Sequence, residues 1–94
     1  MFTSDIQILK LPDILLEKGI IDGPAQFYEE TGISKSFFSQ VKNQEKYGRA
    51  YHFTPEHIEK VALIYGINFN WIFATSEEVF NKKSKAQKVH KLAE

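Results

Sequence analysis

A short segment that follows Ser34 brings together side chains of the types that read nucleic acids. Lys35 and Ser36 carry hydrogen-bond donors that can reach base edges or phosphate oxygens. One turn later the Gln40 amide can make a bidentate contact with adenine, and the Phe37 ring can touch a thymine methyl group. The segment therefore predicts a base-reading surface, unless Phe37 and the adjacent phenylalanine are both core residues of a more deeply buried helix.

Basic and aromatic residues follow directly. Lys42, Lys46 and Arg49 are each typical of solvated surface, but their clustering beside the base-reading segment suits contacts with phosphate. Tyr47 and Tyr51 either hydrogen-bond phosphates or close a loop onto the rest of the protein. These residues extend the predicted surface beyond the helix itself.

Other chemistries lack the residue patterns that they need. The chain has no cysteine, which excludes disulfides, thiolate zinc sites and thiol catalysis. His52, His57 and His90 form no i, i+4 pair that would suit a metal. The adjacent glutamate pairs at 29–30 and 77–78 diverge on a helix, so they support a two-carboxylate hydrolytic site poorly. We therefore expect no enzyme, and no metal, cofactor or small-molecule ligand.

Length and charge narrow the class of protein. Ninety-four residues, 43% of them hydrophobic, make one small globular domain. The net charge is zero, but residues 31 to 53 carry four basic residues and one acidic residue, whereas residues 1 to 30 carry two basic and six acidic residues. The start of the chain lacks a basic leader, and no apolar run approaches the roughly 18 residues that span a bilayer. We expect a cytoplasmic protein.

Glycines, prolines and capping residues divide the chain into segments of helical period and predict an all-α bundle of about five short helices. The first helix either begins near Pro12 or is kinked there, and only Ile6-Gln7-Ile8 alternates as a strand would. The predicted order is a first helix ending before Gly19, a second helix over about 24–30, a third from its cap Ser34 through Asn43, a polar loop over 44–53, a fourth from Thr54-Pro55 to Gly66, a fifth over 69–74 and a further turn over 75–80. Residues 1–80 form the predicted domain, and residues 81–94 a lysine-rich, mobile tail.

The second and third predicted helices have the layout of a helix-turn-helix. Gly32 at the joint permits the positive φ angle that turns the chain sharply. Ile33 and Phe38 can wedge between the two helices, and Phe27 with Val41 can complete the buried angle. The opposite side of the third helix is then free to contact DNA.

These motifs together resemble the lambda-repressor-like helix-turn-helix domains of phage Cro and repressor proteins and their bacterial relatives. The resemblance spans roughly residues 11 to 80, and its parts are Glu17-Lys18-Gly19-Ile20, Thr31-Gly32-Ile33-Ser34-Lys35-Ser36, Asn43 and Ile67-Asn68-Phe69-Asn70-Trp71-Ile72-Phe73. It implies a five-helix bundle whose third helix enters the major groove of double-stranded DNA, usually from a homodimer. By position it implies that the residues reading bases or contacting phosphates include Lys35, Ser36, Phe37, Ser39, Gln40 and Asn43.

Two functions from different classes follow. The favoured one is a sequence-specific DNA-binding transcriptional regulator of the phage or mobile-element repressor type, acting as a homodimer on an operator. The alternative is a protein-binding module of the antitoxin or anti-repressor type, anchored by Phe37, Tyr47 and Tyr51. The zero net charge supports the alternative, as do Pro24 and Tyr28, which depart from the family pattern.

Overall fold

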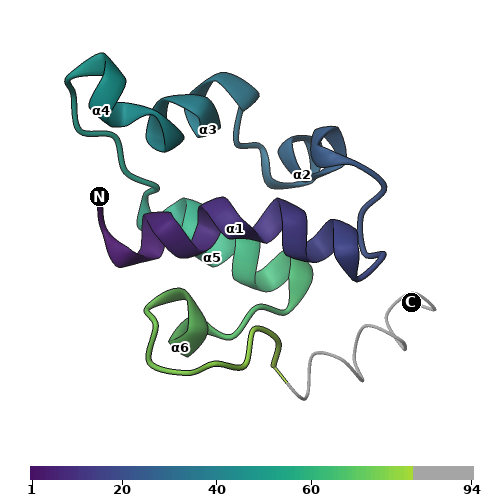
Figure 1. Ribbon diagram of the computed structural model, residues 1–94. Coiled ribbons are helices and arrows are strands. Elements are labelled where there is room, and N and C mark those ends of the chain that lie inside the picture. The colour runs from purple at the N-terminus through teal and green to yellow at the C-terminus, as the bar shows by residue number, and fades with distance from the viewer. Residues whose placement is uncertain (82–94) are drawn as a thin grey trace.

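The computed structural model describes residues 1–81, and within them six helices form (Figure 1). Their bounds in chain order are α1 Thr3–Glu17, α2 Pro24–Thr31, α3 Lys35–Lys42, α4 Gln44–Tyr47, α5 Pro55–Tyr65 and α6 Phe69–Ile72. No strand forms in this part of the chain, which confirms the all-α prediction for it. None of the helices at 1–81 combines the length and apolar character that crossing a membrane requires.

The long helix α1 organises the molecule. It packs against α2, α3 and α6, and α2 also packs against α5. Figure 1 shows α2, α3 and α4 on one side of α1 and α6 on the other. One continuous core joins these layers, and its fully buried large side chains are Ile8, Leu11, Leu15, Ile21, Phe27, Ile33, Val41, Val61, Ile67 and Ile72.

The start of α1 differs from the prediction. The helix begins at Thr3, so a start near Pro12 is wrong, and Pro12 lies buried inside the helix. Ile6-Gln7-Ile8, which alternates as a strand would, is helical as well. The reason lies in burial, because Ile8, Leu11 and Leu15 share one face and carry the apolar period upstream of the proline. That packing outweighs the backbone hydrogen bond that a proline cannot donate.

The ends of α2, α3 and α5 confirm the predictions made from capping residues. Gly32 ends α2 with φ 75°, a left-handed conformation that favours glycine. Ser34 caps α3, since its hydroxyl accepts a hydrogen bond from the Phe37 amide at 3.0 Å. Thr54 caps α5 through the His57 amide, and the His57 ring accepts the Thr54 amide in return.

Two connecting segments differ from the prediction. The expected loop over 44–53 contains the one-turn helix α4, which Gly48 ends with φ 68°. The turn expected over 75–80 is not helical; Phe80 instead forms an isolated antiparallel bridge with Ile67. Two backbone hydrogen bonds stabilise this pairing in place of a helical turn. The amide of Asn68 donates to the carbonyl of Val79, and the amide of Asn81 donates to the carbonyl of Gly66. The tail was predicted over 81–94; Asn81 is held by this pairing, and residues 82–94 lie outside the described residues.

Candidate nucleic-acid interface

Helix α3 is held to the protein by one face. Phe38 and Val41 are buried on this face, as predicted, and the Phe38 ring packs edge-on against Phe27 at a centroid distance of 5.8 Å. Ile33, just before the helix, is buried too. Because one side of α3 is anchored in the core, its other side is presented in a defined orientation.

The predicted contact residues occupy that other side and the segment beyond it. At the start of α3, Lys35 and Ser36 are exposed. The side chains of Ser39 and Gln40 are half-buried, and the Gln40 amide has no hydrogen-bond partner among residues 1–81. The exposed members that follow are Lys42, Asn43, Lys46, Tyr47 and Arg49.

The side chain of Asn43 is hydrogen-bonded to the last turn of α3. Its side-chain amide donates to the Ser39 carbonyl at 3.0 Å and to the Ser39 hydroxyl at 3.3 Å. The Ser39 carbonyl also accepts the backbone amide of Asn43 at 2.9 Å, so the side chain adds a second hydrogen bond to the last turn of α3. Both residues therefore stabilise the C-terminal end of α3, and a partner that binds Ser39 must share or replace this hydrogen bond.

Phe37 lies deeper than the predicted surface position. Its ring is half-buried and packs against three aromatic rings, those of Tyr51, Phe53 and His57, with centroids 5.5 to 6.4 Å apart. The interpretation of Phe37 as a core residue is therefore closer to the structure than that of a free ring. The ring joins α3 to the segment that precedes α5.

The segment after α3 is fastened to the helix by Gln44. Its buried amide donates to the carbonyl of Val41 at 3.0 Å and to the carbonyl of Tyr51 at 2.9 Å. Tyr51 also packs edge-on against Tyr47 at 6.4 Å, and the Arg49 guanidinium lies 5.7 Å from the centre of the Tyr51 ring. The residues predicted from 47 to 51 thus form one aromatic and basic cluster next to α3.

A buried carboxylate ties the far end of this segment to α1. Asp5 is fully buried, and its two oxygens accept hydrogen bonds from the Phe53 amide at 2.8 Å and from the Phe2 amide at 2.9 Å. His52 Nδ1 lies 2.7 Å from the same carboxylate, while the His52 ring stacks on Phe2 at 3.7 Å. These contacts hold residues 52 and 53 against the start of α1 and so limit where the basic cluster can move.

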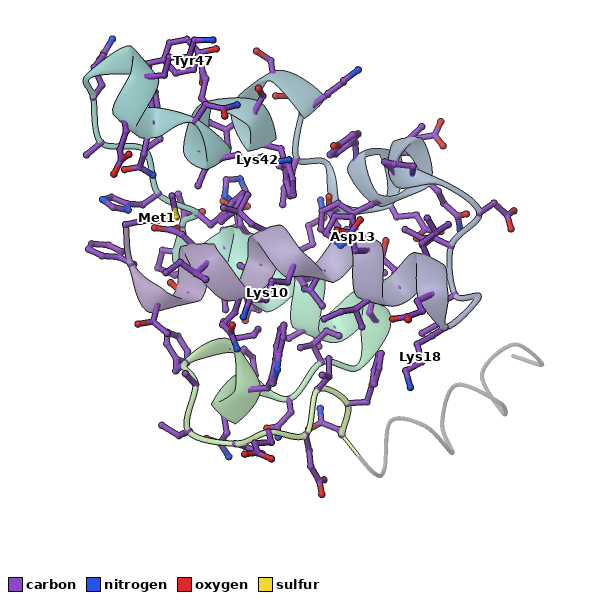
Figure 2. All side chains as sticks on the ribbon, viewed as in Figure 1. Met1, Lys10, Asp13, Lys18, Lys42 and Tyr47 are labelled. Carbon is purple, nitrogen blue, oxygen red and sulfur yellow. The ribbon has the colours of Figure 1, made fainter. Side chains whose placement is uncertain are left out.

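Charge is unevenly placed on this part of the molecule. Within residues 1–81, Lys35, Lys42, Lys46 and Arg49 form no ion pair. A hollow of about 330 Å³ lies between Met1 and the end of α3, and both Lys42 and Lys46 line it, together with Glu45. Figure 2 shows Lys42 and Tyr47 on the α3 and α4 side of the molecule, whereas Lys10 and Lys18 lie along α1. Cations that form no internal pairs are available to an anionic partner.

Tyr65 connects the helix before α3 to α5. The buried hydroxyl of Tyr65 donates to Glu30 at 2.6 Å. Burial first, and then this acidic acceptor, raise the pKa of Tyr65 above its ordinary value of 10.0. The phenol therefore stays protonated at neutral pH, and it stabilises the position of α2 from which α3 is placed.

Three residues that position the surface were not singled out from the sequence. Asp5 and His52 carry no local motif that identifies their partners, because two of the Asp5 contacts span 47 and 48 residues. Gln44 reaches carbonyl groups three and seven residues away, but no capping or turn pattern marks its side chain for these contacts. One signal was present, since an acidic residue near the start of a helix is favourable there. That signal does not reveal the contact with His52.

Comparison of the chain with protein-family models, with curated proteins and with solved structures finds no match. The function of this chain is therefore inferred from its own residues and geometry.

Proposed function

We propose that this protein is a sequence-specific, homodimeric DNA-binding transcriptional regulator of the repressor type. In this proposal α2 and α3 act as a helix-turn-helix of the lambda-repressor-like kind, and α3 lies in the major groove of double-stranded DNA. The observation that carries the proposal is that α3 is amphipathic. Phe38 and Val41 anchor one face in the core, and the other faces carry Lys35, Ser36 and Gln40.

Base reading is assigned to the first two turns of α3. The Gln40 amide has the paired donor and acceptor that match the major-groove edge of adenine, and Lys35 can reach the acceptor atoms of guanine. Ser36 can donate to either a base or a phosphate. Phe37 is a positioning residue in this proposal, because its ring is held by Tyr51 and Phe53.

Phosphate contact is assigned to the segment after α3. Lys42, Lys46 and Arg49 are exposed and without ion pairs inside residues 1–81, and Tyr47 is 52% exposed beside them. Phosphate contacts set the position of a protein on the duplex, while base contacts select the sequence. Hydrogen bonds from Gln44 and to Asp5 hold this segment in place. This supports its assignment to phosphate contact, since contacts that position a protein on DNA need a fixed geometry.

A second candidate function is a protein-binding module. The observation that favours it is the aromatic cluster of Phe37, Tyr47 and Tyr51, in which Tyr47 remains half exposed and Arg49 lies over the Tyr51 ring. Tyrosine and arginine together are typical of residues that dominate protein interfaces. If the protein is such a module, the aromatic cluster is the main contact with the partner, and the exposed cations lie around it without contacting phosphate.

Selection from a library of random duplexes tests the two candidates. The purified full chain is incubated with the library at two salt concentrations, and the bound duplexes are sequenced. A DNA-reading regulator enriches a palindromic site, whose symmetry reflects the two-fold axis of a homodimer. Under the protein-binding candidate no site is enriched at either salt concentration.

Gln40→Ala, selected in the same way, tests the assigned base contact. We expect the base preference to relax at one position of each half-site, with an affinity loss of about 1–3 kcal/mol on the original site. Lys10→Ala on α1 is the control and should leave the selected site unchanged. An unchanged preference in Gln40→Ala contradicts the assignment of Gln40.

A further inference from the structure

A second surface, separate from the exposed side of α3, is hollowed and apolar. A groove of about 640 Å³ lies where the starts of α1 and α5 meet α6. Phe2, Phe69 and Phe73 line it and are 58%, 49% and 51% exposed, and Phe53 and Ile58 line it as well. Three half-exposed phenylalanine rings around one groove are more apolar surface than isolated side chains explain. Figure 1 shows α6 on the opposite side of α1 from α3 and α4, so the DNA surface proposed above does not include this groove.

The charge of the groove selects the kind of partner. Glu56 and Glu59 line it, and none of the lysine, arginine or histidine side chains within residues 1–81 does. Lys60, the nearest cation along α5, points elsewhere, since its Nζ atom lies beside Gly32 at the end of α2. Two copies of the groove placed face to face would oppose these carboxylates with identical ones, which is unfavourable. The groove therefore suits an occupant that is both apolar and basic.

The chain itself carries a segment of that composition. Residues 82–94 include five lysines and one glutamate. Among the lysines, Ala86, Val89 and Leu92 recur at every third position. This pattern is complementary to a groove with apolar walls and an acidic edge, because the lysines can face the carboxylates while the apolar side chains contact the rings.

We propose that residues 82–94 dock in cis in the groove between α5 and α6, with Val89 and Leu92 against the phenylalanine rings and the lysines beside Glu56 and Glu59. The docked segment covers the exposed rings and places its lysines away from α3. The basic charge of the segment then contributes to the fold of its own chain and not to the DNA surface.

The length of the segment permits this path. The amide of Asn81 donates to the Gly66 carbonyl at 2.9 Å, so the last described residue lies at the C-terminal end of α5. The groove lies at the N-terminal end of α5, a helix of 11 residues and therefore about 16 Å long. Thirteen residues span about 20 Å even as a helix and about 43 Å when extended, so either conformation reaches the groove.

Paramagnetic relaxation tests the proposal in the full chain. The absence of native cysteine lets a single nitroxide label be attached at Gln87→Cys without other changes. We expect the amide signals of Ile58, Glu59, Phe69 and Phe73 to lose intensity in the labelled protein. The matched control carries Val89→Ser and Leu92→Ser as well, and these signals should regain their intensity because the apolar contact is lost.

Four outcomes overturn the proposal. The first is unchanged intensity at the groove in the labelled protein, and the second is a loss of intensity that persists in the Val89→Ser, Leu92→Ser control. The third is a loss at Lys35 to Lys42 in place of the groove, which means that the basic segment lies along α3. The fourth is a loss seen when labelled protein is mixed with isotope-enriched, unlabelled protein, which means that the segment occupies the groove of a second copy. None of these changes alters the described residues, so a failure to fold is not expected to obscure the result.

Discussion

His57 shows how one residue can serve a helix end and respond to pH. Its ring nitrogen Nδ1 accepts the Thr54 amide at 3.1 Å, a role that the doubly protonated imidazolium cannot perform. Burial lowers the pKa of His57 from 6.5; Glu56 opposes this shift, and Lys60 adds to it. The folded state therefore favours neutral histidine at this position.

The sign of the resulting pH dependence follows directly. Because the unfolded chain binds the proton more tightly than the folded one, the free energy of unfolding should decrease as the pH falls below 6.5, until the folded residue is protonated too. In His57→Gln, the glutamine can accept the same amide without titrating. We expect the loss of the ring contact with Phe37 to lower the stability of this variant by the same amount at every pH. Between about pH 8 and about pH 5.5 the variant should therefore lose less stability than the wild type does. Urea unfolding of both proteins at the two pH values measures this difference, and equal losses would contradict the role given to His57.

At the scale of secondary-structure elements, Gly32 forms the turn that joins α2 to α3. Its φ of 75° is strained for any residue with a Cβ atom, and an added Cβ would lie 3.1 Å from Nζ of Lys60. The lysine tip can move, so the backbone strain dominates the cost. We expect Gly32→Ala to lower the free energy of unfolding by about 1–2 kcal/mol, measured as a lower denaturation midpoint at unchanged slope.

Gly23→Ala is the matched control for this prediction. Gly23 precedes α2 with an extended backbone, φ −175°, which any residue can adopt, and a Cβ there meets no atom within 4 Å. We expect Gly23→Ala to lower the free energy of unfolding by less than about 1 kcal/mol, since alanine is only moderately less favourable than glycine at this capping position. If both variants are destabilised equally, the left-handed conformation at Gly32 is not the cause.

The starts of α3, α5 and α6 were predictable because capping depends on residues close together in sequence. Ser34, Thr54 and Asn68 each contact an amide two or three residues away, so their roles can be read from local order. The one-turn helix α4 was not predicted, because the amide of Gln44 that fastens it reaches the carbonyl of Tyr51 across a loop. The bridge between Ile67 and Phe80 was not predicted either, because its two residues are separated along the chain and share no local pattern.

The charge distribution matters at the scale of the whole molecule. A net charge of zero conceals a cluster of cations that begins at α3 and ends at Arg49. If this cluster contacts phosphates, the logarithm of the binding constant for DNA should fall linearly with the logarithm of salt concentration. We expect the double variant Lys42→Gln, Arg49→Gln to lower that slope by about 1.8, since each phosphate contact contributes about 0.9.

Lys10→Gln with Lys18→Gln removes the same charge from α1 and is the control. Both residues are exposed, and Figure 2 shows them along α1. Their loss should leave the slope unchanged, as measured by fluorescence anisotropy of a labelled duplex over a series of salt concentrations. Equal slopes in the two double variants would mean that net charge alone, and not the position of Lys42 and Arg49, drives the binding.

The linear order of residues was enough to establish the all-α class of the described chain, the span of α3 and the faces that Phe38 and Val41 bury. These features follow from helical period and capping, which act within a few residues. The start of α1, the inward packing of Phe37 and the contacts of Asp5 with His52 and Phe53 depended on tertiary structure. Such contacts join residues up to 48 positions apart, and a local pattern cannot specify which distant partner will be adjacent once the core has formed.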